Sequence, residues 1–155
     1  MRQRPDSTHR SRLRGFTLIE VMIALVVIAL LAAVAYPAYT SAIAKNRRAE
    51  GVAAIAAVQL AQERWRSNND TYSDSFTDLK VGEYSSPAEY YKLTISNNNE
   101  IGYTVTATAV TGKAQASDTN CVRLQVVLER AIVKYRSGAS DGALDTTNQH
   151  KCWSR

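Results

Sequence analysis

The feature that most limits how this chain can fold is an uninterrupted apolar run near its N-terminus. Residues 16–36 contain one charged side chain, that of Glu20. A run of about 20 apolar residues is long enough to cross the hydrocarbon core of a bilayer as a helix. Residues 1–15 carry five arginines, and positive charge beside a membrane segment stays on the cytoplasmic side. We therefore expect a single transmembrane helix over 16–36, with residues 37–155 outside the cytoplasm.

The carboxylate of Glu20 is the unusual part of this run. A charged group inside a membrane segment costs several kcal/mol by most estimates, so it is a functional candidate. The alternative is a plain signal anchor, in which Glu20 lies close enough to the interface to extend toward water.

The segment GFTLIEVMIALVVIALLAAVAYP, residues 15–37, resembles the N-terminus of type IV pilins and pseudopilins. The resemblance rests on Gly15, Phe16, Glu20 and Pro37 in this order. It implies that a prepilin peptidase and methyltransferase removes residues 1–15 as a leader peptide, cutting between Gly15 and Phe16, and N-methylates Phe16. The apolar helix is then a membrane anchor before assembly and part of the fibre core afterwards. We expect the leader itself to be disordered.

Glu20 has a physical role in such a fibre. The free amine of Phe16 would be buried among apolar helices, and an unpaired buried charge is very costly. Glu20 lies one helical turn from Phe16, so the amine of a neighbouring subunit would come within its reach. We expect this pair to set the axial register of the subunits.

The helical pattern continues from Phe16 to about Arg66 and includes Pro37, where we expect a kink. Four alternating segments follow, and their short connections predict an antiparallel meander. They span residues 91–95, 103–107, 122–128 and 131–135. The predicted fold class is α+β, a type IV pilin fold. Its long N-terminal helix packs the second half on a four-stranded antiparallel sheet.

Two apolar surfaces run along the second half of the helix. One is predicted from Ile55, Val58, Gln62 and Trp65, and the other from Ala53, Ala57, Leu60 and Ala61. A helix that is apolar on more than one side is buried on more than one side. We expect one side of the helix to face the sheet and the other to face neighbouring subunits.

A small charged cluster, Lys45, Arg47 and Arg48 with Glu50, lies on the same helix. In a single subunit it is expected to be a solvated face. In a fibre, its cations would pair with acidic groups of a neighbour.

Residues 67–89 are polar and rich in turn formers, which predicts a long loop between helix and sheet. Asp70, Asp74 and Asp78 recur there every four residues, which is not the EF-hand spacing. Asp141, Gly142 and Asp145 near the C-terminus read as a turn. Calcium at either place is a remote alternative, and we predict no metal and no cofactor.

Two cysteines, Cys121 and Cys152, lie in the part expected outside the cytoplasm. An even number of cysteines in an exported chain indicates a disulfide, with two free thiols as the alternative. A bridge would tie down a polar tail that would otherwise fray. The resemblance to pilins implies that residues 136–151, enclosed by this bridge, face outward on a fibre.

The net charge of +5 at first favours a nucleic-acid partner. Residues 1–15 hold +4 of it, however, so the chain after Gly15 carries only +1. DNA affinity depends largely on phosphate neutralisation, so no nucleic-acid partner is expected. His9 and His150 are the only histidines, and no phosphate-binding loop or nucleophile motif occurs, so we expect no enzyme.

Most of the chain after Gly15 resembles PilE-like minor pilins of the type IVa system. The segments that carry this are RRAEGVAAIAAVQLAQERWRSNNDTY, GYTVTATA, AQASDTNC and the final CW. The resemblance implies a subunit that primes or enters a type IV pilus and serves twitching motility and adhesion. Its expected partners are other pilins, the inner-membrane assembly platform and, before assembly, the lipid bilayer. A type II secretion pseudopilin, and an adhesive or DNA-uptake pilin acting as a binding module, are the alternatives.

Overall fold

The structure is a computed structural model that describes residues 15–83 and 88–153. Most of the predicted leader, residues 1–14, lies outside this description. The chain divides into two compact units, Met1–Tyr39 and Thr40–Arg155.

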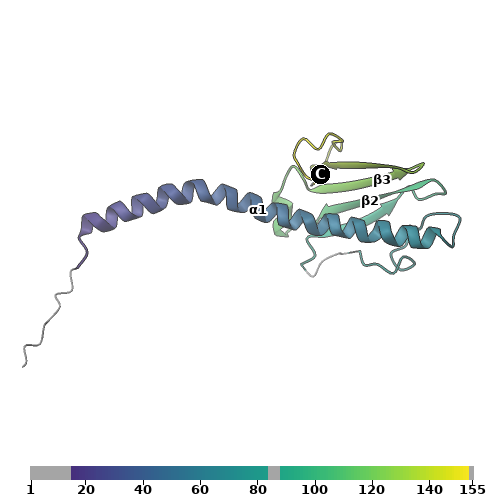
Figure 1. The fold of residues 1–155 in the computed structure, drawn as a ribbon, viewed down its shortest axis with the longest axis horizontal. Coiled ribbons are helices and arrows are strands. Elements are labelled where there is room, and N and C mark those ends of the chain that lie inside the picture. Colours follow the sequence, from purple (N-terminus) through teal and green to yellow (C-terminus); the bar gives the residue numbers. More distant parts are fainter. Residues whose placement is uncertain (1–14, 84–87, 154–155) are drawn as a thin grey trace, which may run out of the picture. The chain divides into compact units, whose positions relative to one another are not determined.

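A single long helix, α1, covers Leu18–Arg66 (Figure 1). It begins two residues later than predicted because Thr17 caps it: the Thr17 hydroxyl accepts a hydrogen bond from the backbone N–H of Glu20 at 3.2 Å. It ends at Arg66, as predicted, where the side-chain amide of Asn69 donates to the carbonyl of Trp65 at 2.8 Å. Pro37 lies inside the helix, and the assignment continues on both sides of it. The kink remains a prediction.

The first unit consists of the apolar half of α1. Its large side chains are exposed, among them Leu25, Ile28, Leu31 and Tyr36. This helix is long and apolar enough to cross a membrane. A continuous apolar surface of this kind needs lipid or other apolar helices around it.

The second unit contains a four-stranded antiparallel sheet in the order β1-β2-β3-β4. The strands are β1 (Tyr91–Ser96), β2 (Gly102–Ala109), β3 (Arg123–Glu129) and β4 (Ile132–Gly138). A short 3₁₀ helix, η1 (Ala114–Ser117), lies in the connection between β2 and β3. The meander predicted from the alternating segments is confirmed.

The fourth strand runs three residues further than predicted. Ser137 is the reason, because it pairs with Leu124 of β3 on one side and bridges to Asp145 on the other. Ser137 and Asp145 exchange two backbone hydrogen bonds, of 2.9 and 2.7 Å. The tail therefore holds the end of the edge strand in place.

The core lies between the second half of α1 and one face of the sheet (Figure 1). From the helix, Ile55, Val58 and Gln62 are fully buried, as predicted, and Trp65 is half-buried. From the sheet, the alternating inward residues are buried: Tyr91, Leu93, Tyr103, Val105, Ala107, Leu124 and Val126.

The predicted second helix surface is partly wrong. Ala53, Ala57 and Leu60 are exposed, but Ala61 is buried against the sheet. Ala61 lies three residues after Val58, and this helical spacing places both on the sheet side. The exposed surface of the helix is therefore narrower than the sequence pattern indicated.

Gln62 is a polar residue inside this core. Its side-chain amide donates to the carbonyl of Ser73 at 2.5 Å and accepts from the Ser73 N–H at 3.0 Å. A buried amide is tolerated when its groups are paired. This pairing fixes the start of the predicted 67–89 loop, whose residues 84–87 lie outside the described part, against the helix.

Candidate functional site

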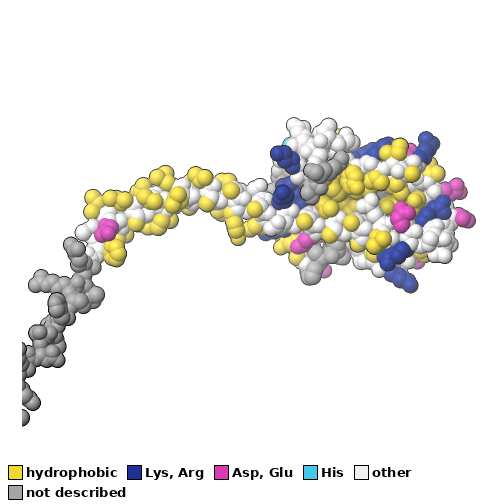
Figure 2. Space-filling view, in the orientation of Figure 1, with side chains coloured by type: hydrophobic (Ala, Val, Ile, Leu, Met, Phe, Trp, Pro, Cys, Tyr) yellow, Lys and Arg dark blue, Asp and Glu magenta, His cyan; other side chains and the backbone are white. Residues whose placement is uncertain are grey.

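The start of the mature chain implied by the resemblance is exposed in the structure. Phe16 has 82% of its surface accessible, and Gly15 before it is exposed as well. Glu20 lies in the first turn of α1, where a carboxylate interacts favourably with the helix dipole. Figure 2 shows hydrophobic side chains over this half of the helix, with one acidic side chain near its start. The geometry leaves Phe16 and Glu20 available to other molecules.

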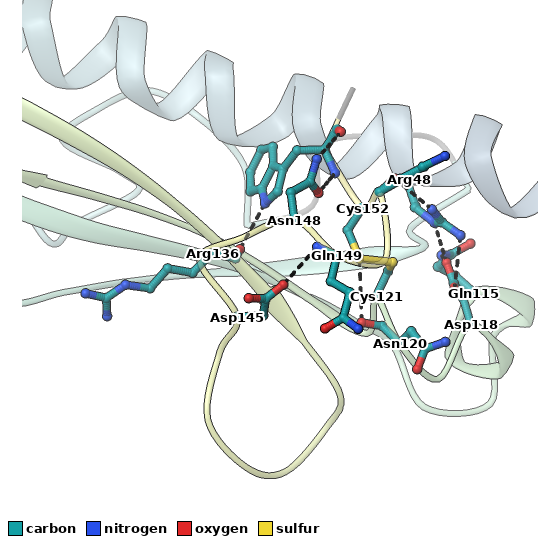
Figure 3. Close-up of a disulfide and its surroundings, with 12 residues drawn as sticks. Arg48, Gln115, Asp118, Asn120, Cys121, Arg136, Asp145, Asn148, Gln149 and Cys152 are labelled. Carbon is teal, nitrogen blue, oxygen red and sulfur yellow. Dashed lines mark hydrogen bonds and ion pairs between the residues drawn. A yellow bond between two sulfur atoms is a disulfide. The ribbon is translucent and has the colours of Figure 1, made fainter. Parts of the chain in front are cut away.

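The second region that sequence reasoning singled out is the C-terminal disulfide (Figure 3). Cys121 and Cys152 are bonded, with a Cα–Cα distance of 5.6 Å, and the prediction is confirmed. Both cysteines are buried.

Trp153, which follows Cys152, packs on β4. Its ring packs edge-on against Tyr135 at 5.0 Å between centroids, and its indole N–H donates to the carbonyl of Arg136 at 3.0 Å. The last described residue is therefore anchored on β4.

Two side chains shape the backbone before the disulfide. Asn148 is paired with Trp153: its side-chain amide donates to the Trp153 carbonyl at 2.9 Å and accepts from the Trp153 N–H at 3.0 Å. Asp145 accepts from the Thr147 hydroxyl and from the backbone N–H groups of Thr147 and Gln149. These hydrogen bonds hold the pKa of Asp145 below its ordinary value, and the bond from the Thr147 hydroxyl contributes most. Asp145 thus organises a turn, as predicted.

A buried ion pair attaches the disulfide region to α1 (Figure 3). Arg48 donates through Nε to Asp118 Oδ2 and through a terminal nitrogen to Oδ1 at 3.3 Å, and it also reaches the carbonyl of Lys151 at 3.2 Å. The amide of Gln115 donates to Asp118 at 2.8 Å. We call Arg48, Gln115 and Asp118 the clasp.

The clasp corrects the interpretation of the charged cluster on the helix. Arg48 does not lie on a solvated face, because its side chain is only 16% exposed and pairs within the chain. Arg47 lies over the ring of Tyr90, 5.2 Å from its centroid, while Lys45 is exposed. Sequence reasoning missed Asp118 and Gln115, since Asp118 is 70 residues from Arg48 and no local pattern connects them.

Two tyrosines, Tyr91 and Tyr103, are buried in the core. Burial raises the pKa of Tyr91 and of Tyr103, so both hydroxyls stay neutral. The Tyr91 hydroxyl donates to the carbonyl of Cys121 at 3.4 Å. Tyr91 thereby links the core to the disulfide.

Within residues 15–83 and 88–153, no group of three or more His, Cys, Asp or Glu side chains is placed to hold a metal ion. The backbone N–H of Asp78 donates to the Ser75 hydroxyl at 3.2 Å, and the Asp141 carboxylate accepts from the Ser140 hydroxyl at 3.1 Å. Both aspartates belong to turns.

The long N-terminal helix, its exposed apolar half and the meander sheet closed by a C-terminal disulfide define a type IV pilin. Residues 10–36 match the prokaryotic N-terminal methylation motif. Residues 37–125 match the family described as type IV minor pilin ComP, DNA uptake sequence receptor. This match covers more than half of the chain, so the chain belongs to that family. Such a pilin is anchored in the membrane by its apolar helix before it is assembled into a surface pilus.

Relatives with curated names agree with the class. The chain is 32% identical over 103 residues to the type IV major pilin protein PilA of Myxococcus xanthus, covering 66% of this chain and 41% of the relative. It is 37% identical over 84 residues to a fimbrial protein of Neisseria meningitidis, covering 49% of each. A type IV major fimbrial protein FimA of Dichelobacter nodosus is 54% identical over 43 residues, which are 28% of this chain and 27% of the relative. The chain thus spans less than half the length of these relatives.

Proposed function

We propose that this chain is a structural subunit of type IV pili, a minor pilin that primes the fibre or is incorporated in it. The observation that carries the proposal is the exposed apolar half of α1 with Glu20 as its one charge. Such a surface is suited to lipid before assembly and to a bundle of like helices afterwards. The family match supports the minor rather than the major role.

The proposed maturation begins in the inner membrane, with residues 1–15 in the cytoplasm. The prepilin peptidase cuts between Gly15 and Phe16 and methylates the new amine. The exposure of both residues and the match to the methylation motif support this step. The assembly platform then passes the subunit to the other pilins. No catalytic role is proposed for the chain itself.

Glu20 is proposed to set the register by pairing with the Phe16 amine of a neighbour. The test is to express Glu20→Gln beside the wild-type subunit and to measure incorporation into sheared fibres by mass spectrometry, which also reports the Phe16 terminus and its methylation. We expect incorporation to fall at least ten-fold, because an unpaired buried amine costs several kcal/mol. The matched control is Glu63→Gln, which removes an exposed carboxylate from the part of α1 that belongs to the second unit. Equal incorporation of Glu20→Gln and wild type would reject the register role.

A type II secretion pseudopilin is the alternative within the same fold. The two functions are separated by deletion of the gene. Loss of twitching with normal exoprotein secretion supports the pilin, and the opposite result supports the pseudopilin.

The description of the matched family favours a second candidate function, uptake of DNA. This differs from the expectation drawn from the charge of +1 after Gly15. The candidate contact surfaces are the loops within 67–89 and 136–151. We expect the soluble part, residues 44–155, to retard duplex DNA with an affinity that falls as salt rises. Absence of salt-dependent binding would reject this candidate and leave the fibre function intact.

A further inference from the structure

The end of α1 and the loop that follows it enclose a groove of about 470 Å³, which we call the tryptophan groove. It is lined by residues 61, 64 and 65 of the helix and by residues 68, 69 and 78–80 of the loop. All of these residues belong to the second unit, so the shape of the groove depends on that unit alone. No step of the proposed fibre function uses it.

The buried residues that line the groove are apolar. Ala61 and Leu79 are buried, and Trp65 is half-buried where it packs against the core. Ala61 lies one helical turn before Trp65, on the same face of α1. Its side chain is a single methyl group, which is too small to cover the indole. The groove therefore has an aromatic floor that a ligand can reach.

The exposed residues that line the groove are polar and of mixed kind. Arg64 and Lys80 offer hydrogen-bond donors, Asp78 offers acceptors, and the amide of Asn68 offers both. None of the ion pairs between described residues involves Arg64, Asp78 or Lys80. These side chains can therefore bind a ligand without breaking an ion pair within the described part of the chain.

Hydrogen bonds hold the two walls of the groove in place. The side-chain amide of Asn69 donates to the Trp65 carbonyl at 2.8 Å, and Arg66 donates to the Asn69 carbonyl at 2.5 Å. In the loop wall, the backbone N–H of Val81 donates to the Phe76 carbonyl at 3.0 Å. A site formed in advance loses less conformational entropy when a ligand binds.

An aromatic floor with a mixed polar rim matches the chemistry of a sugar ring. A pyranose has C–H groups on one face, which pack on the electron-rich face of an indole. Its hydroxyls are both donors and acceptors, so they can pair with cations, amides and a carboxylate at once. A phosphate is disfavoured because the Asp78 carboxylate in the same groove repels it. An apolar ligand is disfavoured because it would leave the polar rim without partners.

We propose that the tryptophan groove binds a pyranose saccharide. The sugar ring packs on Trp65, and its hydroxyls pair with Asp78, Asn68 and Arg64. The volume lies within the range of small-molecule sites. The inference does not depend on which fibre the subunit joins or on whether the chain binds DNA. A fibre that contains this subunit carries a contact for glycans.

The test titrates the full chain with lactose and with cellobiose, in phosphatidylcholine nanodiscs that contain no sugar-headed detergent. Saturation-transfer NMR of the sugar protons and tryptophan emission measure binding. We expect saturable binding, with the strongest transfer to the C–H protons of one ring face and a blue shift from Trp65. Asp78→Ala should weaken binding about ten-fold, because a charged acceptor is lost. Trp65→Phe keeps an aromatic ring in the core and should weaken binding about five-fold.

The matched control is Asp74→Ala, which removes an exposed carboxylate from the same loop outside the groove. It should bind both sugars as wild type does. Failure of wild type to bind either sugar saturably, or an equal loss of binding in the control, would overturn the proposal. Tighter binding of inorganic phosphate or of a short DNA duplex than of sugar, weakened by the same two variants, would overturn it in favour of an anion site. Incorporation into fibres is measured separately, so the fibre function can stand if sugar binding fails.

Discussion

Gly51 lies where α1 packs on a tyrosine ring of the sheet. A Cβ built there would lie 2.9 Å from the Tyr91 ring, which is itself fully buried. In the sequence, this glycine is only a weak helix former within a strong helix. In the structure, it makes room for the aromatic ring on which the helix packs.

We expect Gly51→Ala to destabilise the second unit by about 1–2 kcal/mol, because overpacking against Tyr91 outweighs the roughly 1 kcal/mol gained in helix propensity. Urea unfolding measures the difference. The control is Ala53→Gly on the exposed side of the same helix, which should cost about 1 kcal/mol by propensity alone. A more stable Gly51→Ala protein would contradict the tight packing.

Asp145 makes the tail sensitive to acid. Its pKa lies below the ordinary 3.8 in the folded chain, mainly because of the Thr147 hydroxyl and backbone bonds. A lowered pKa gives stabilisation that is present above the ordinary value and lost as pH falls through the folded value. We therefore expect the amides of Thr147 and Gln149 to lose protection from hydrogen exchange only in acid. In Asp145→Asn, the hydrogen-exchange protection of these two amides should not change with pH. Full protection of both amides in acid in the wild-type chain would refute this role of Asp145.

At the scale of elements, the clasp determines how η1 and the tail meet the helix. Both charged side chains are nearly buried, at 16% and 10% exposure, and they share two hydrogen bonds. Removal of one partner leaves the other charge buried without compensation, which costs about 3–5 kcal/mol in comparable pairs. The pair is therefore sensitive to changes on either element.

A double-mutant cycle with Arg48→Met and Asp118→Asn tests this contact. We expect each single change to cost about 3 kcal/mol in urea unfolding and the coupling energy to be about 1–3 kcal/mol. The control cycle is Lys134 with Glu129, a half-exposed pair on the β3–β4 hairpin that should couple by less than about 1 kcal/mol. Equal coupling in both pairs would show that burial adds nothing to the clasp.

In the whole molecule, the two units are stabilised in different ways. The first is apolar on its surface and depends on lipid or other subunits. The second has its own core and a disulfide that closes a separation of 31 residues. We expect the second unit to keep its fold when the first is removed.

Loss of the disulfide should lower the free energy of unfolding of the second unit, but the unit should still fold. For a loop of this length, the entropic model gives about 3.5–4 kcal/mol. Residues 44–155 with Cys121→Ser and Cys152→Ser should unfold at lower urea by that amount but retain strand signals in circular dichroism. Complete unfolding of the double variant in buffer would show that the core alone is insufficient.

The parts of this protein that depend on local pattern could be predicted from the sequence. The apolar run, its single carboxylate and the period-2 strands are periodic features of neighbouring residues, and they predicted the helix, the meander and the family resemblance. Cysteine parity predicted the bridge, because only two cysteines are present.

Contacts between residues far apart in the sequence could not be predicted from local pattern and are seen only in the folded chain. Arg48 meets Asp118 across 70 positions, Trp153 meets Tyr135 across the tail, and Ala61 turned out to face the sheet. An arginine has the same charge, size and polarity whether it is exposed to solvent or paired within the chain, as Arg48 is. Which of the two occurs depends on the packing of α1 on the sheet and on the path of the chain after β2, and neither is written in a local pattern.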